Sequence, residues 1–204
     1  MIATRESFPI FTPEEYFEWE ERQEIRHEYF DGEVYAMTGG TLNHSEIATN
    51  FGALLKAHLR GGGCRLLNGD ARVNIHNSNK YVYPDLSVTC DERDRTNTKF
   101  VSHPCLIVEV LSPSTEAYDR GDKFAMYRLS PSLQDYVLVS ADKIAIDIYH
   151  KDDRGKWDII NYRSGDLVEL VSIGLTFSLA KPFRMKIEQI YEDIIFEVDD
   201  RKFI

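Results

Sequence analysis

Hydrophobic and polar residues follow a different period in each part of the N-terminal third of the chain. Thr12-Pro13-Glu14-Glu15 has the form of a capping box with proline at the first helical position, and it predicts an amphipathic helix over residues 13–23. Asp31-Gly32 between two short alternating stretches predicts a hairpin over residues 28–37. Apolar residues then recur at helical spacing over residues 44–60, where three consecutive glycines end the pattern.

The middle of the chain consists of short apolar runs separated by turn residues. These runs predict strands over residues 64–67, 71–75, 81–89, 105–111 and 136–140. A helical pattern over residues 116–129 separates the last two of them. Strand, helix and strand in this order predict a βαβ unit with two parallel strands.

The C-terminal part alternates short strands with turns over residues 143–180, which predicts an antiparallel extension of the same sheet. We expect one α/β domain with an α+β tendency over residues 1–204. Its parts are a core at about 40–140, an N-terminal helix and hairpin at 12–37, the extension at 143–180, and a terminal helix (185–191) with a charged tail, together 185–204.

Composition places the chain among soluble globular proteins, because it is 43% hydrophobic and 28% charged. No apolar run approaches the roughly 20 residues that cross a bilayer, and the N-terminus lacks the apolar core of a signal peptide. We therefore expect a cytoplasmic protein that does not associate with a membrane. Cys64, Cys90 and Cys105 are an odd number without a Cys-x-x-Cys pair, which predicts reduced thiols.

A net charge of -10 argues against a nucleic-acid partner, but its distribution weakens that argument. Residues 12–34 contain nine acids and two arginines, so this stretch alone contributes -7. Residues 40–135 contain eleven acids and eleven lysines or arginines, and their charges cancel. The part of the chain with the candidate chemistry is therefore not acidic.

Glu109 is the only charged residue in the apolar run Cys105–Leu111. A buried carboxylate without a partner costs several kcal/mol, so a cation is expected beside it. The sequence offers two candidates for this cation. One is a metal ion shared with Asp85, and the other is Lys123 on the following helix.

Asp85 and Glu109 lie on neighbouring predicted strands, so antiparallel pairing would bring them together. Two carboxylates suit Mg²⁺, or Mn²⁺ in its place, and the backbone carbonyl of Val110 is a candidate third ligand. Asp119, Lys123 and Tyr127 follow one another at four-residue spacing and share one helix face. A lysine there can polarise a phosphate, although a surface bridge between Asp119 and Lys123 is the plainer interpretation.

The remaining candidate residues and motifs give weaker evidence of a site, or are absent from the chain. His44 stands near the start of the helix predicted over 44–60, where a phosphate binds favourably, although a histidine there is more often solvent-facing. The chain has neither a phosphate-binding loop ending in Lys-Ser/Thr nor a Gly-x-Ser-x-Gly elbow. These absences remove the commonest nucleotide-hydrolase and serine-hydrolase interpretations, and no nucleotide cofactor is expected.

Several spaced motifs together resemble a known family over residues 12–180. They are Tyr83-Pro84-Asp85, the run from Leu106 to Thr115, Asp119-Arg120-Gly121-Asp122-Lys123 with Tyr127, and, upstream, Glu28-Tyr29-Phe30-Asp31-Gly32-Glu33 with His44. The pattern is similar to that of the putative restriction endonuclease family in the PD-(D/E)XK nuclease superfamily.

The resemblance implies a restriction-endonuclease-like core, a central mixed sheet flanked by helices, and metal-dependent cleavage of DNA. Asp85 and Glu109 correspond to the metal ligands. The superfamily lysine normally stands two residues after the acid, where this chain has Leu111, so Lys123 would take its place. Glu28 resembles the accessory acid of some members.

Three hypotheses follow. The first is a Mg²⁺- or Mn²⁺-dependent DNA endonuclease, expected as a homodimer because two subunits would let one site act on each strand. The second is a non-catalytic protein with the nuclease fold that binds DNA or a protein partner. In the third, an unrelated α+β protein uses Asp85, Glu109 and Lys123 as a buried salt-bridge cluster.

Overall fold

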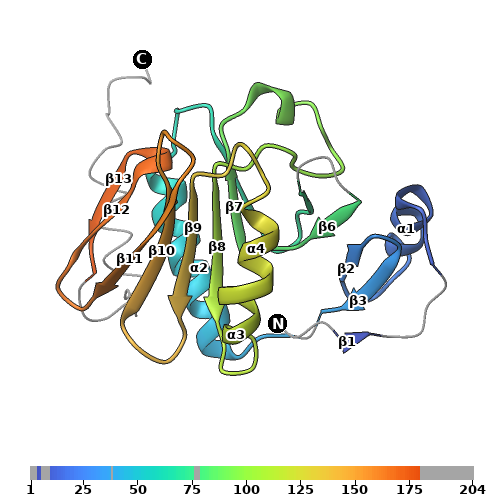
Figure 1. Ribbon diagram of the computed structural model, residues 1–204, viewed down its shortest axis with the longest axis horizontal. Coiled ribbons are helices and arrows are strands. Elements are labelled where there is room, and N and C mark those ends of the chain that lie inside the picture. The colour runs from blue at the N-terminus through green and yellow to red at the C-terminus, as the bar shows by residue number, and fades with distance from the viewer. Residues whose placement is uncertain (1–3, 6–9, 38, 76–78, 180–204) are drawn as a thin grey trace, which may run out of the picture.

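Six strands form a mixed sheet in the order β11-β10-β9-β8-β7-β4 (Figure 1). The computed structural model describes residues 4–5, 10–37, 39–75 and 79–179. The strands are β4 (Arg65–Asn68), β7 (Leu86–Thr89), β8 (Leu106–Leu111), β9 (Asp135–Ser140), β10 (Ala145–Lys151) and β11 (Trp157–Arg163). Only β8 and β9 pair in parallel within this sheet, as the predicted βαβ unit requires.

Helices cover both faces of this sheet. Helix α2 (Leu42–His58) packs Phe51 and Leu55 against Val108 on one face. The segment that crosses over from β8 to β9, residues 112–134, lies on the other face, beside β8 in Figure 1, and packs Tyr127 against Ile107. The alternation of side chains along β8 therefore divides it between two apolar layers, and both layers are needed to bury it.

The N-terminal part forms a second, five-stranded sheet in the order β1-β3-β2-β6-β5. Its elements are β1 (Thr4–Arg5), α1 (Pro13–Glu20), β2 (His27–Phe30), β3 (Glu33–Ala36), β5 (Val73–Asn74) and β6 (Lys80–Val82). The predicted capping box is confirmed, because Thr12 and Glu15 exchange side-chain and backbone hydrogen bonds. The predicted hairpin is also confirmed, and Asp31 and Gly32 both have positive φ (50° and 107°) in its turn.

The prediction of one strand over residues 81–89 is wrong. Two strands occupy this stretch, β6 in the five-stranded sheet and β7 in the six-stranded sheet, with Tyr83–Asp85 between them. Pro84 has no N–H to donate to a ladder, so a continuous run of apolar residues is interrupted where the chain passes from one sheet to the other. Asp85 lies at this junction.

The predicted helix over residues 116–129 is not uniform. It consists of α3 (Glu116–Tyr118), a π-helical segment (Asp119–Lys123) and α4 (Phe124–Tyr127). Wider π turns inside α-helices are frequently found at functional sites. Here the segment carries Lys123.

The predicted C-terminal extension is only partly correct. Strands β10 and β11 extend the six-stranded sheet, whereas β12 (Leu167–Leu170) and β13 (Leu175–Ser178) form a separate two-stranded sheet. Short 3₁₀ turns occupy Glu92–Asp94 and Val171–Ile173. The helix expected over 185–191 lies outside the described residues. None of the helices in the described ranges is both long and apolar enough to span a membrane.

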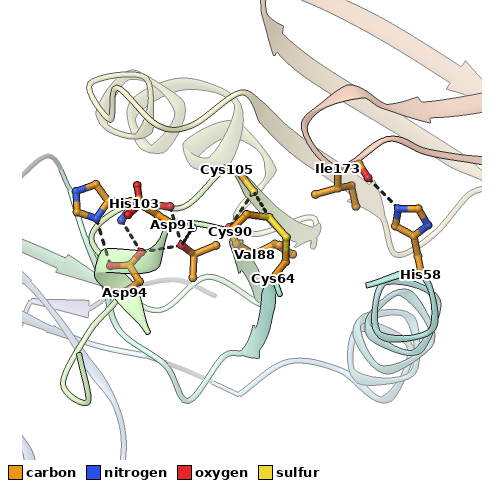
Figure 2. Close-up of a disulfide and its surroundings, with 10 residues drawn as sticks. His58, Cys64, Val88, Cys90, Asp91, Asp94, His103, Cys105 and Ile173 are labelled. Carbon is orange, nitrogen blue, oxygen red and sulfur yellow. Dashed lines mark hydrogen bonds and ion pairs between the residues drawn. A yellow bond between two sulfur atoms is a disulfide. The ribbon is translucent and has the colours of Figure 1, made fainter. Parts of the chain in front are cut away.

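The prediction of three reduced thiols is wrong for Cys64 and Cys90, which form a disulfide (Figure 2). Arg65 pairs with Thr89 across β4 and β7, so the next residues, Cys64 and Cys90, face each other beyond the strand ends. This proximity depends on strand register, which the spacing of the cysteines does not reveal. Cys105 remains a free thiol, with its Sγ 3.8 Å from Cys90 Sγ.

Candidate active site

Asp85 immediately precedes β7 and is buried, with a residue exposure of 8%. Its Oδ2 accepts a hydrogen bond from the backbone N–H of Val110 at 2.7 Å. The Nε2 atom of His44, from the first turn of α2, lies 3.1 Å from the same oxygen, although it does not meet hydrogen-bond geometry. A neighbouring strand and a helix therefore both fix this carboxylate.

Glu109 lies in β8 and is also buried. The antiparallel register pairs Leu86 with Val108, so Asp85 and Glu109 follow at opposed positions one step further along. The Oε1 atom of Glu109 lies 2.8 Å from Lys123 Nζ and accepts a hydrogen bond from the Tyr127 hydroxyl at 3.0 Å. The partner expected on the following helix is therefore present, and it does not exclude a metal ion.

Lys123 lies near two further carboxylates. Its Nζ is 3.8 Å from Asp119 Oδ1 within the π-helical segment, and 3.9 Å from Glu28 Oε1 on β2. Glu28 also accepts a hydrogen bond from the Tyr83 N–H at 3.3 Å. The plainer interpretation of a solvated Asp119–Lys123 bridge is wrong, because both residues are buried.

The pKa values reflect this crowding of charge. Burial raises the pKa of Glu109 to about 8, which Lys123 opposes and Asp85 and Asp119 reinforce. Burial lowers the pKa of Lys123, but Glu109, Glu28 and Asp119 outweigh it and hold that pKa well above its usual range. Burial also raises the pKa of Asp85, yet the His44 ring, the Val110 N–H and Lys123 together keep it below its ordinary value.

The charges and free oxygens of the cluster suit a hard divalent cation. Glu28, Asp85, Glu109 and Asp119 are four buried carboxylates around Lys123, and the negative charges of Asp85 and Asp119 add to burial in raising the pKa of Glu109. Among the described residues, no protein group donates to Asp85 Oδ1 or Glu109 Oε2. Mg²⁺ uses one or two carboxylates and retains water, so Asp85 and Glu109 fit it.

A larger set of side-chain ligands is not present. Within the described ranges, no three histidine, cysteine, aspartate or glutamate side chains are grouped so as to hold a metal ion. The donors available for such an ion are therefore the two carboxylates, backbone carbonyls such as that of Val110, and water.

The structure brings together all the residues that the sequence singled out as candidates. Glu28 arrives from the other sheet, and the sequence connected it to the site only through the family resemblance. Tyr83 was not predicted as a site residue, although its N–H fixes Glu28 and its hydroxyl accepts a hydrogen bond from Arg72 Nε at 2.6 Å. Its position two residues before Asp85 was the available signal.

Comparison with protein families gives a match over residues 13–180 to the family described as "Putative restriction endonuclease". The chain belongs to this family. Relatives in Synechocystis sp. include uncharacterized protein slr1290, which is 55% identical over 186 residues (90% of this chain and 98% of the relative). Uncharacterized protein sll1609 of the same organism is 32% identical over 150 residues (72% of this chain and 85% of the relative).

One solved structure has a fold similar to that of this chain. The crystal structure of a putative nuclease belonging to DUF820 from Anabaena variabilis matches with a TM-score of 0.68 and 17% identity. The match covers 83% of this chain and 95% of that chain. The fold is thus a restriction-endonuclease-like mixed α/β fold, as the family resemblance implied.

Proposed function

We propose that this protein is a metal-dependent endonuclease that hydrolyses phosphodiester bonds in DNA. The 2.8 Å ion pair between Lys123 and Glu109, with Asp85 at the opposed position of the next strand, carries the proposal. Two carboxylates and an ammonium group are thereby combined in a buried cluster, on a fold of the nuclease type. Membership of the putative restriction endonuclease family supports the same conclusion.

In this proposal Asp85 and Glu109 hold Mg²⁺ or Mn²⁺, with the Val110 carbonyl as a further ligand. Such an ion, when bound, lowers the pKa of a coordinated water and neutralises charge that develops on the phosphodiester. The Val110 N–H and His44 keep the Asp85 carboxylate in place and ionised. Tyr127 orients the carboxylate of Glu109 through its hydrogen bond.

Lys123 has the role that the superfamily gives to a lysine at the position of Leu111. Its pKa, held well above the ordinary value by three carboxylates, keeps the ammonium group protonated. A fixed positive charge there stabilises negative charge on the attacked phosphate and orients the attacking water. Glu28 and Asp119 position Lys123 and do not touch the substrate.

We also propose that the protein acts in the cytoplasm as a homodimer with one site for each DNA strand. A two-fold symmetric pair supplies two sites, so that each strand of a duplex is cleaved by one of them. Light scattering after size-exclusion chromatography, with and without a duplex oligonucleotide, measures the oligomeric state directly. A monomer under both conditions would remove the homodimer from the proposal and leave the chemistry in place.

The test of the activity is cleavage of plasmid and single-stranded DNA with Mg²⁺, with Mn²⁺ and with a chelator. We expect metal-dependent cleavage, and the isosteric changes Asp85→Asn and Glu109→Gln should each lower its rate by about 100-fold or more. Asp135→Asn is the matched control. Asp135 is a buried carboxylate in β9 whose partners, His150 and the backbone N–H of Ser172, do not belong to the cluster.

Other outcomes separate the remaining hypotheses. Metal-dependent cleavage that survives both isosteric changes would remove Asp85 and Glu109 from the mechanism. DNA binding without cleavage in any metal would favour the non-catalytic nuclease fold. No DNA binding and no calorimetric signal from Mg²⁺ or Mn²⁺ would favour a purely structural salt-bridge cluster.

A further inference from the structure

A basic groove lies beside the candidate active site. Four cationic side chains line it, Arg26, Arg65, Arg72 and Lys99, and its volume is about 390 Å³. Two acids, Glu21 and Asp70, also line it, so its net charge is +2 in a chain whose net charge is -10. This concentration of positive charge was not visible in the sequence, because the four residues are spread over 74 positions from 26 to 99.

Among the described residues, no carboxylate lies within ion-pair distance of three of the four cations of this groove, Arg65, Arg72 and Lys99. Arg26 pairs with the exposed Asp70 at 3.9 Å. The Arg72 guanidinium donates to the Tyr83 hydroxyl and lies 5.1 Å from the centre of the Phe17 ring. Fixed guanidinium groups that lack an anion are suited to phosphate.

A second hollow, which we call the site groove, reaches Asp85 and His44 of the candidate active site, although Glu109 and Lys123 are not among the residues that line it. It has a volume of about 750 Å³, and His44, Asp85 and Lys56 are among the residues that line it. The basic groove and the site groove share Leu67 and Asn68 at the end of β4. The two hollows therefore adjoin each other at the end of β4, with Asp85 in the lining of the site groove.

The wall that α2 contributes to the site groove leaves room for a ligand. Ser45, Thr49 and Gly52 line it at helical spacing and precede Lys56 on the same side of the helix. His44 Nε2 also lies on this wall, 3.1 Å from Asp85 Oδ2. Small residues and flanking cations together favour a phosphate-bearing chain.

We infer that the basic groove binds the phosphodiester backbone of the DNA strand next to the scissile phosphate. This inference rests on the proposed function, which it deepens by assigning the path of the strand. Arg26 and Lys99 bind phosphates as exposed charges, Arg72 fixes the register, and the strand passes Asn68 to reach Asp85. The contacts are to phosphate and therefore independent of base sequence.

The test measures affinity and cleavage separately. Binding of fluorescein-labelled single-stranded and duplex oligonucleotides is followed by anisotropy with a chelator present, and cleavage is followed with Mg²⁺. The test variant combines Arg26→Ala with Lys99→Ala, two exposed side chains. The control combines Arg154→Ala with Lys156→Ala, which removes the same charge near β11, at the opposite edge of the sheet from β4.

We expect the test variant to bind DNA at least about tenfold more weakly at low salt and to raise KM with kcat changed less than about twofold. The slope of log affinity against log salt is negative, and its magnitude should decrease by about 1.4–1.8, since each lost phosphate contact contributes about 0.7–0.9. The control should change affinity less than about twofold. Charge reversal, Arg26→Glu with Lys99→Glu, should enlarge the effect.

Failure of the inference is distinguishable from failure of the proposed function. If the wild type cleaves DNA and the test variant matches it in affinity, salt slope and KM, the basic groove is not the path of the strand. If the wild type binds DNA through these residues but never cleaves, the groove stands and the endonuclease proposal falls. A wild type that neither binds nor cleaves DNA overturns both.

Discussion

Lys123 compensates several buried charges at once. Its Nζ lies 2.8 Å from Glu109, 3.8 Å from Asp119 and 3.9 Å from Glu28, and all four residues are buried. An isolated surface pair contributes little to stability, whereas removal of one partner from a buried group leaves uncompensated charge. The same residue thus matters for folding and for the proposed chemistry, and the two roles have to be measured separately.

Lys123→Met tests the structural role, because methionine keeps most of the volume and removes the charge. We expect the free energy of unfolding to fall by about 3–5 kcal/mol, since Glu109 and its neighbours lose their cation. Urea denaturation of the wild type and the variant measures the difference. Lys156→Met, at an exposed pair with Asp158, is the control and should change it by less than about 1 kcal/mol. Equal effects of the two substitutions would contradict this account.

Cys105 gives a prediction that is independent of the candidate site. Burial raises the pKa of its thiol to about 11, so the fraction present as reactive thiolate is small at pH 8. Alkylation by iodoacetamide should therefore be slow at pH 8 and accelerate about tenfold per pH unit as pH rises toward 11. Mass spectrometry of the native and the urea-unfolded protein measures the rates, and fast alkylation of native Cys105 at pH 8 would contradict the burial effect.

Local elements were largely predictable from the sequence, whereas their assignment to sheets was not. The capping box at Thr12 and the Asp31-Gly32 turn are determined by neighbouring residues, and both were predicted correctly. The division of residues 81–89 between two sheets depends on packing between distant segments. Local periodicity has no information about such contacts, which also explains why Tyr83 was missed.

The residues of the candidate site were likewise only partly predictable from the sequence. Asp85, Glu109 and Lys123 could be found because a charge in an apolar strand, its opposed neighbour and the next helix are close in sequence. The π-helical turn that carries Lys123 leaves no comparable pattern, and neither does the arrival of Glu28 from another sheet. The disulfide was mispredicted because the count of cysteines was odd, and only the β4–β7 register places Cys64 opposite Cys90.

The Cys64–Cys90 disulfide joins the ends of β4 and β7 and closes a loop with a sequence separation of 26 residues. Restriction of the unfolded chain by a loop of this size is worth about 3.5 kcal/mol. Reductant, or the double change Cys64→Ser with Cys90→Ser, should therefore lower the urea midpoint. Cys105→Ser is the control and should leave the effect of reductant unchanged. An unaltered midpoint in both cases would show that the crosslink does not stabilise the fold.

At the scale of the whole molecule, charge is distributed unevenly in a way that bears on DNA binding. The net charge is -10, and the exposed side of α1 carries Glu14 and Glu18. The same helix contributes Phe17, whose ring lies near Arg72 and Lys99, so acidic and basic surfaces adjoin each other. Like charges near a phosphate-binding surface oppose association over roughly one Debye length, about 8 Å at physiological salt.

Glu14→Gln combined with Glu18→Gln should therefore strengthen DNA binding. We expect an increase in affinity of a few-fold at 50 mM salt and almost none at 300 mM, because salt screens exposed charges. Anisotropy of the labelled oligonucleotides at both salt concentrations measures it. Asp152→Asn with Asp153→Asn, in the turn between β10 and β11, removes the same charge far from the groove and is the control. If this control strengthened binding equally, total charge alone would govern association, and the position of α1 beside the basic groove would have no part in it.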